Sequence, residues 1–130
     1  MISTKLKKIF IFSIPIFILH EIEEFITGFW KVDPLTNYVA KFFPDRNLAI
    51  FTIFNLELLL FMVVVALALK SEKWQLRMFT LFGFVYFFEL SHVVRLFNTF
   101  EYYPGMITAF MSLIIGFFFW KELLANYKTI

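Results

Sequence analysis

Four long apolar segments constrain the fold of this chain more than any other feature of its sequence. They cover about residues 9–30, 47–69, 76–97 and 104–124. Each is long enough to cross the hydrocarbon core of a bilayer, about 30 Å thick, as a helix that rises about 1.5 Å per residue. Of the 130 residues, 61% are hydrophobic, well above the roughly 45–50% of soluble domains. We therefore predict an all-α integral membrane protein, a four-helix transmembrane bundle in which residues 1–130 form a single domain.

The positions of the basic residues predict how this bundle is oriented. They gather before the first segment, around the second connection and near the end of the chain, at Lys5, Lys7, Lys8, Lys70, Lys73, Arg77, Lys121 and Lys128. The positive-inside rule then places the N-terminus, the C-terminus and the second connection in the cytoplasm, as an even number of spans requires. We expect a multi-pass protein of the cell membrane with the lipid bilayer as its partner. Nucleic acid is not an expected partner, because the basic residues are spread along the membrane edges.

The start of the chain and the first connection also have predicted structures. The stretch "MISTKLKKIFIFSIPIFIL" is similar to a secretory signal, but no small-residue cleavage site follows it, so we expect a retained first helix. Asp33 and Pro34 suit the N-cap and the first position of a helix, and Pro44 would end that helix. We expect a short helix over residues 34–43 on the membrane surface. Disulfides and thiolate metal sites are excluded, because the chain has no cysteine.

Ionisable residues lie inside three of the four apolar segments. The first segment contains "HEIEE" at residues 20–24, the second contains Asn55 and Glu57, and the third contains "ELSHVVR" at residues 89–95. Each charged residue near the centre of a membrane helix opposes insertion by about 2.5–3.5 kcal/mol. We infer that these side chains meet inside the bundle, where a cation or shared protons offset the cost of their burial.

Depth and angle along the predicted helices support this meeting. Antiparallel packing brings the polar residues of the first three segments to a common level, roughly 8–15 Å below the outer surface. His20, Glu23 and Glu24 have the spacing i, i+3 and i+4 and share one helix face, whereas Glu21 projects about 100° away. The third segment carries a Glu-x-x-His spacing, which also places both side chains on one face.

Carboxylate and imidazole side chains on facing helices are typical of metal sites in four-helix bundles. Oxygen ligands together with imidazoles suit Zn, Fe or Mn, so a divalent metal is the expected cofactor. The candidate ligands are His20, Glu23, Glu24, Glu57, Glu89 and His92. This set is large enough for a dinuclear site. A single metal with an outer carboxylate is the alternative, because only one segment has the Glu-x-x-His order and the fourth segment offers no strong ligand.

Four residues have expected roles beside the metal. Glu21 or Glu24 would act as the catalytic base. Asn55 would hydrogen-bond within the polar cluster. Arg95 would contact an anion or a lipid headgroup, or else extend to the outer surface and pair with Glu101.

The stretches that carry these residues resemble the HXXEE-domain family of small bacterial integral membrane proteins. His20, Glu23 and Glu24 match the motif of that family, and "ELSHVVRLF" and "EYYPGMIT" are similar to its later features. The resemblance spans most of the chain. It implies a membrane location and functional weight on the three motif residues, and it implies no particular reaction because the family has no established activity.

Three kinds of function remain open. The favoured one is a metal-dependent membrane enzyme, a hydrolase or an oxidoreductase, acting on a lipid or another apolar small molecule. The second is a proton- or cation-coupled transporter that uses the glutamates as a relay, and a chain this small would then have to form a homo-oligomer. The third is an accessory or sensor protein whose polar network is structural, so that substitutions would change its stability alone.

Overall fold

The computed structural model describes residues 2–128, and in this part of the chain all regular structure is helical. The elements are α1 (Thr4–Thr27), α2 (Phe29–Val32), α3 (Pro34–Ala40), α4 (Arg46–Lys70), α5 (Glu72–Thr99) and α6 (Met106–Tyr127). The prediction of an all-α protein is confirmed. Three helices, α4, α5 and α6, are long and apolar enough to cross a membrane. Helix α1 is of similar length, at 24 residues, but carries ionisable side chains near both of its ends.

Short polar residues set where the helices begin. Asp33 caps α3, with its side chain accepting from the Thr36 backbone N–H at 2.7 Å, and Pro34 occupies the first helical position. Asp45 caps α4 in the same way. Such caps satisfy backbone donors that have no partner inside the helix. Gly28 ends α1 with a φ of 79°, a left-handed conformation that favours glycine.

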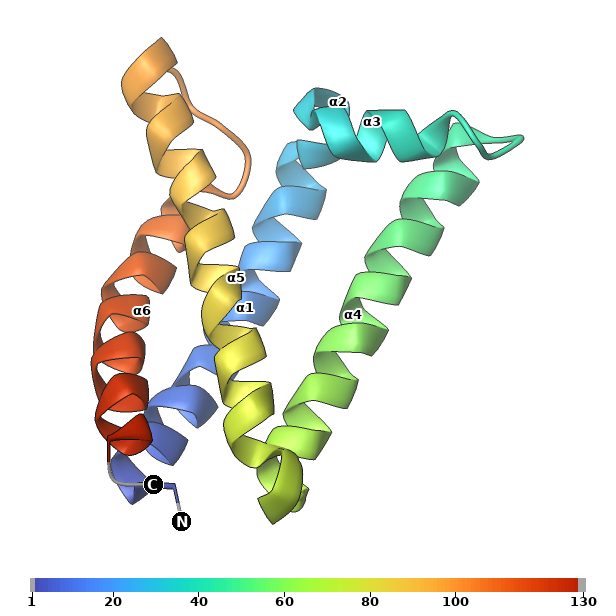
Figure 1. Ribbon diagram of the computed structural model, residues 1–130. Helices are drawn as coiled ribbons and strands as arrows, with labels where there is room; N and C mark the ends of the chain where they lie inside the picture. Colours follow the sequence, from blue (N-terminus) through green and yellow to red (C-terminus); the bar gives the residue numbers. More distant parts are fainter. Residues whose placement is uncertain (1, 129–130) are drawn as a thin grey trace.

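The long helices pack unevenly. Helix α6 lies against both α1 and α5, and α4 lies against α5. Figure 1 shows α2 and α3 connecting the ends of α1 and α4 that lie far from both termini. Helices α1 and α4 touch through aromatic pairs, with ring centroids of Phe17 and Phe61 6.3 Å apart and those of Phe25 and Phe54 5.5 Å apart.

An aromatic core holds α1, α5 and α6 together. Ring centroids of Phe10 and Phe79 lie 4.6 Å apart, those of Phe10 and Phe82 4.7 Å, and those of Phe17 and Phe82 4.8 Å. Tyr86 closes this core and hydrogen-bonds through its hydroxyl to that of Ser13 at 2.6 Å. Aromatic pairs at such spacings stabilise a core beyond the burial of their area.

The same face of α5 carries the core and the polar residues. Buried positions recur every three or four residues along it, at Gln75, Phe79, Phe82, Tyr86, Glu89 and His92. This spacing is that of one helix face. Glu89 and His92 therefore follow directly on the aromatic core, at the end of α5 that faces the second half of α1.

Candidate functional site

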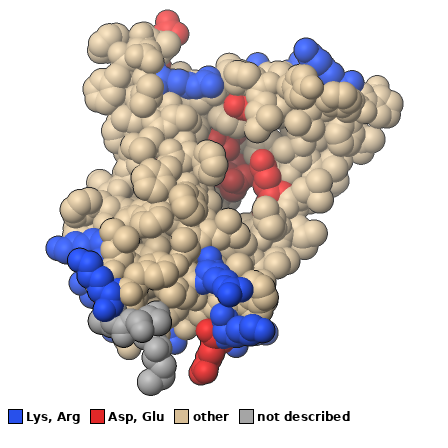
Figure 2. All heavy atoms as spheres, viewed as in Figure 1, with Lys and Arg blue, Asp and Glu red and all other residues tan. Residues whose placement is uncertain are grey.

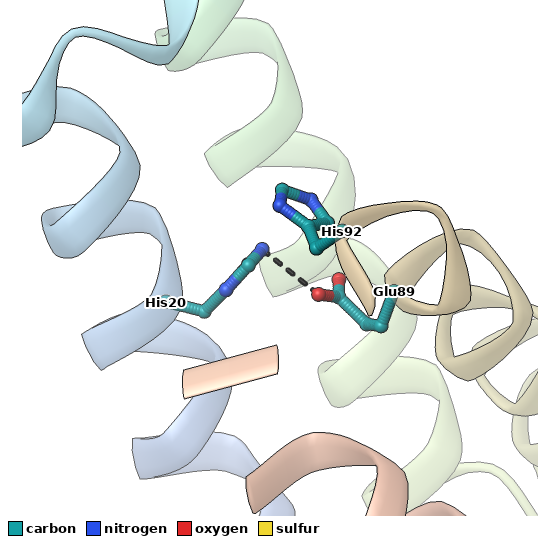
Figure 3. Close-up of side chains that lie close together, drawn as sticks. All are labelled: His20, Glu89 and His92. Carbon is teal, nitrogen blue, oxygen red and sulfur yellow. Dashed lines mark ion pairs between the residues drawn. The ribbon is translucent and has the colours of Figure 1, made fainter. Parts of the chain in front are cut away.

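A buried cluster of acidic and imidazole side chains lies where α1 meets α5. His20 comes from α1, and Glu89 and His92 come from α5 (Figure 3). One potential ligand atom from each of the three lies within 4.8 Å of the other two. The three residues are only 3%, 5% and 4% exposed, so bulk water does not screen them. The predicted meeting of the first and third polar segments is present in the structure.

Glu24 joins this cluster from the next turn of α1. Its Oε1 lies 3.3 Å from Nε2 of His20 and 3.3 Å from Nε2 of His92. On the other side, Oε2 of Glu89 lies 3.0 Å from Nε2 of His20. Two carboxylates and the Nε2 atoms of two imidazoles thus converge on one place.

The outer nitrogen of His92 fixes the orientation of that ring. Nδ1 of His92 lies 2.9 Å from the backbone carbonyl oxygen of Pro104. A carbonyl oxygen only accepts, so Nδ1 carries the hydrogen and donates it. In the neutral ring, Nε2 then presents its lone pair to the cluster.

His20 is fixed in the same sense by Thr108. Nδ1 of His20 lies 2.8 Å from the Thr108 hydroxyl. That hydroxyl has a single hydrogen, and its two other neighbours, Oε2 of Glu23 at 2.6 Å and the Gly105 carbonyl at 3.2 Å, are both acceptors. The hydroxyl therefore donates to one of them and accepts from Nδ1 of His20, which leaves the Nε2 lone pair of the neutral ring facing inward.

The cluster therefore contains many hydrogen-bond acceptors and few hydrogen-bond donors. Oε2 of Glu89 is buried and accepts no hydrogen bond within residues 2–128, although Nε2 of His20 is 3.0 Å away. A buried carboxylate in this condition needs a positive partner. Either a cation held between the four groups or protons added to the imidazoles would supply it.

Glu23 lies outside this cluster, in contrast to its predicted place among the metal ligands. It accepts from the backbone N–H groups of Ile107 and Thr108, at 3.1 and 2.9 Å, and from the Tyr102 hydroxyl at 2.7 Å. Successive residues of a helix project about 100° apart. Glu24 therefore points toward α5, whereas Glu23 points toward the start of α6.

The carboxylate of Glu23 lies at the N-terminus of α6, which is the positive end of the helix dipole. Partial burial and the bond to Glu23 both raise the pKa of Tyr102, so that its phenol stays protonated and donates. Glu23 thus fastens Thr108, and through Thr108 the ring of His20.

Glu57 and Asn55 also lie apart from the cluster, although the sequence predicted them in it. Glu57 is exposed and lines a cavity between α3 and α4. Asn55 is exposed as well, and its amide donates to the Phe51 carbonyl of its own helix at 2.7 Å. Helices α1 and α4 do meet at this end, where the ring centroids of Phe25 and Phe54 lie 5.5 Å apart. Glu57 instead faces α3, and Asn55 turns back onto its own helix.

The remaining predicted residues are found at the edge of the site. Glu21 is half-buried and lies close enough to Glu24 and Glu57 to feel their charges. The Arg95 guanidinium lies 4.6 Å from the centre of the Tyr103 ring, a cation–π contact. Among residues 2–128, it forms no salt bridge with Glu101.

The connection between α5 and α6 contributes site residues that the sequence did not reveal as such. Gly105 has a φ of 83°, and a Cβ atom there would lie 2.8 Å from both Cγ of Glu24 and Cε1 of His20. Only glycine permits so close an approach. Tyr103 packs edge-on against His92, with ring centroids 5.3 Å apart. The available signal was the Pro-Gly pair at residues 104–105, placed directly before a helix.

Together, the fold and the site define a small helical protein with three helices able to cross a membrane and a buried His/Glu cluster. A family model described as "Protein of unknown function with HXXEE motif" matches residues 11–120. The chain belongs to this HXXEE family, as the resemblance in its sequence indicated. No curated protein and no solved structure matches the chain.

We expect Glu23→Ala to destabilise the protein, because it removes four hydrogen bonds at the start of α6. Loss of a helix cap costs about 0.5–2 kcal/mol. The measurement is the thermal unfolding midpoint in detergent, with the exposed Glu101→Gln as the control variant. An unchanged midpoint in Glu23→Ala would contradict the role given to this side chain.

Proposed function

We propose that this protein spans the membrane with four helices, holds a divalent metal ion in its His/Glu cluster and uses it in an enzyme reaction on a lipid-soluble substrate. The proposed ligands are His20, Glu24, Glu89 and His92. Zn, Fe or Mn suits such a set of two imidazoles and two carboxylates.

One observation carries the proposal: two imidazoles and two carboxylates lie buried in contact with one another, and three of them have ligand atoms within 4.8 Å of one another. The distances between their atoms, 3.0 to 3.3 Å, support a metal ion. A tetrahedral zinc ion with bonds of about 2.0–2.1 Å keeps its ligand atoms about 3.3–3.4 Å apart. Three of the contacts within the cluster therefore have spacings close to those of neighbouring zinc ligands.

The groups behind the ligands also support metal binding. Histidines that bind metals usually donate their other ring N–H to a carbonyl, a carboxylate or a similar acceptor, which orients the ring. His92 does so to Pro104, and His20 does so to Thr108, which is held in turn by Glu23. Both Nε2 atoms are thereby directed inward, where a metal ion would accept their lone pairs.

A bound metal of this kind would act as a Lewis acid or lower the pKa of a bound water. The protein would supply a base beside it. Glu21 is the candidate, because it is half-buried next to His20 and has no hydrogen bond or salt bridge from its side chain within residues 2–128. Glu24 is assigned to metal binding instead, since it contacts both histidines.

The proposal predicts metal in the purified protein. Elemental analysis of detergent-purified wild type should find about one Zn, Fe or Mn per chain, and His92→Ala should retain less than a tenth of it because one ligand is lost. Glu101→Gln is the matched control and should keep its metal. Circular dichroism should show that each variant is folded. A folded wild type without metal would leave protons on the imidazoles as the explanation, and the enzyme proposal would fall.

The role of Thr108 gives a sharper comparison. Thr108→Val removes the acceptor for His20 but keeps the shape of the side chain, whereas Thr108→Ser keeps the hydroxyl. Loss of such an outer contact lowers metal affinity about 10–100-fold. Competition with a metal chelator should show this loss for the valine variant and little change for the serine variant. Equal affinities in both variants would refute the role of the hydroxyl.

The proposed four spans predict that both ends of the chain are cytoplasmic. Figure 1 places the two termini at the same end of the molecule, which supports an even number of crossings. Fusions of green fluorescent protein to either end should fluoresce, and fusions of alkaline phosphatase should be inactive, because the first reporter works inside the cell and the second outside. An active phosphatase at the C-terminus would contradict four spans with a cytoplasmic N-terminus.

A further inference from the structure

A groove lies between α3 and α4. It holds a cavity of about 260 Å³ lined by Leu35, Thr36, Val39, Ile53, Leu56 and Glu57. Figure 2 shows the hollow on this face of the molecule, with acidic side chains gathered inside it and basic ones at the edges. Four of the six lining residues are aliphatic, so the walls suit a hydrocarbon chain.

The carboxylate of Glu57 is the one charged group in this lining. Within residues 2–128 it forms no hydrogen bond and no salt bridge. The charged groups close enough to act on it, Glu21, Glu24 and Asp33, are all acidic. The groove therefore combines apolar walls with an uncompensated negative charge.

The nearby basic side chains are engaged elsewhere. Arg46 donates to Asn37, and its guanidinium lies 5.6 Å from the centre of the Trp30 ring. Lys31 also lies over Trp30, at 5.1 Å. A carboxylate within an apolar groove is costly without a positive partner, so a ligand that brings its own cation complements it.

We propose that this groove binds a lipid-soluble amine in its ammonium form. Glu57 holds the cationic head, and the alkyl chain lies along Leu35, Val39 and Leu56. Glu57 is close enough to Glu24 for their charges to interact, which brings the amine head near the His/Glu cluster. Binding depends on the groove alone; the further step, in which this amine is the substrate of the metal centre, rests on the proposed function.

The test measures binding in nanodiscs of zwitterionic lipid. A fluorescent long-chain trimethylammonium probe is displaced by dodecyltrimethylammonium, by uncharged dodecanol or by dodecyl sulfate, and empty nanodiscs correct for partition into lipid. Wild type should prefer the ammonium compound. Glu57→Gln should weaken its binding about tenfold or more, as expected for loss of the opposite charge that pairs with the ammonium head, and should leave dodecanol binding unchanged.

Two further variants keep the test decisive. Glu101→Gln changes an exposed carboxylate away from the groove and should bind like wild type. Val39→Trp fills the apolar wall and should abolish binding of the probe while Glu57 remains. Thermal unfolding shows whether each variant is folded. Equal ammonium affinity in wild type and Glu57→Gln, retained binding in Val39→Trp, or equal displacement by dodecyl sulfate would overturn the proposal.

Metal analysis of the same samples separates this proposal from the previous one. Glu57→Gln should keep its metal, and His92→Ala should keep its ammonium binding. Ammonium binding that depends on Glu57 in a metal-free wild type would leave the groove proposal standing and refute the metal centre. Stoichiometric metal without any preference for the ammonium compound would do the reverse.

Discussion

The arrangement of this molecule depends on one constraint: carboxylates and imidazoles buried among apolar helices must compensate one another. His20 and Glu24 of α1 meet Glu89 and His92 of α5 at distances of 3.0 to 3.3 Å. Their burial is compatible with a stable fold only if a cation or protons shared among them offset their charge. The hydrogen bonds behind the two rings determine where that cation or those protons are needed, because they direct both Nε2 atoms inward.

The HXXEE motif acquires a physical meaning from this arrangement. Its histidine and second glutamate form the inner cluster, while its first glutamate binds the start of α6. Three helices are thereby joined through five consecutive residues of α1. Since Thr108 bonds to both Glu23 and His20, the docking of α6 and the orientation of the histidine are coupled.

The two halves of the molecule differ in their packing: one holds the aromatic core, and the other holds a cavity. The aromatic core around Phe10, Phe82 and Tyr86 fastens α1, α5 and α6 near the termini. In the other half, Glu57 lines a cavity between α3 and α4 instead of joining the cluster. The aromatic core thus stabilises one end of the molecule, and the cavity at the other end would be the place for a ligand from the bilayer.

The sequence by itself determined the helices, and four of the six candidate ligands that it predicted lie together in the structure. Length and hydropathy indicate the helices. The three- or four-residue spacing places His20 and Glu24 on one face of their helix, and Glu89 and His92 on one face of theirs, since a helix turns once every 3.6 residues. Only the tertiary structure decided that Glu23 turns to α6, that Glu57 faces a groove and that Thr108 and Gly105 complete the site. These outcomes depend on how the helices cross and rotate against one another. Side-chain packing between helices sets those angles, so they cannot be predicted from the periodicity of a single helix.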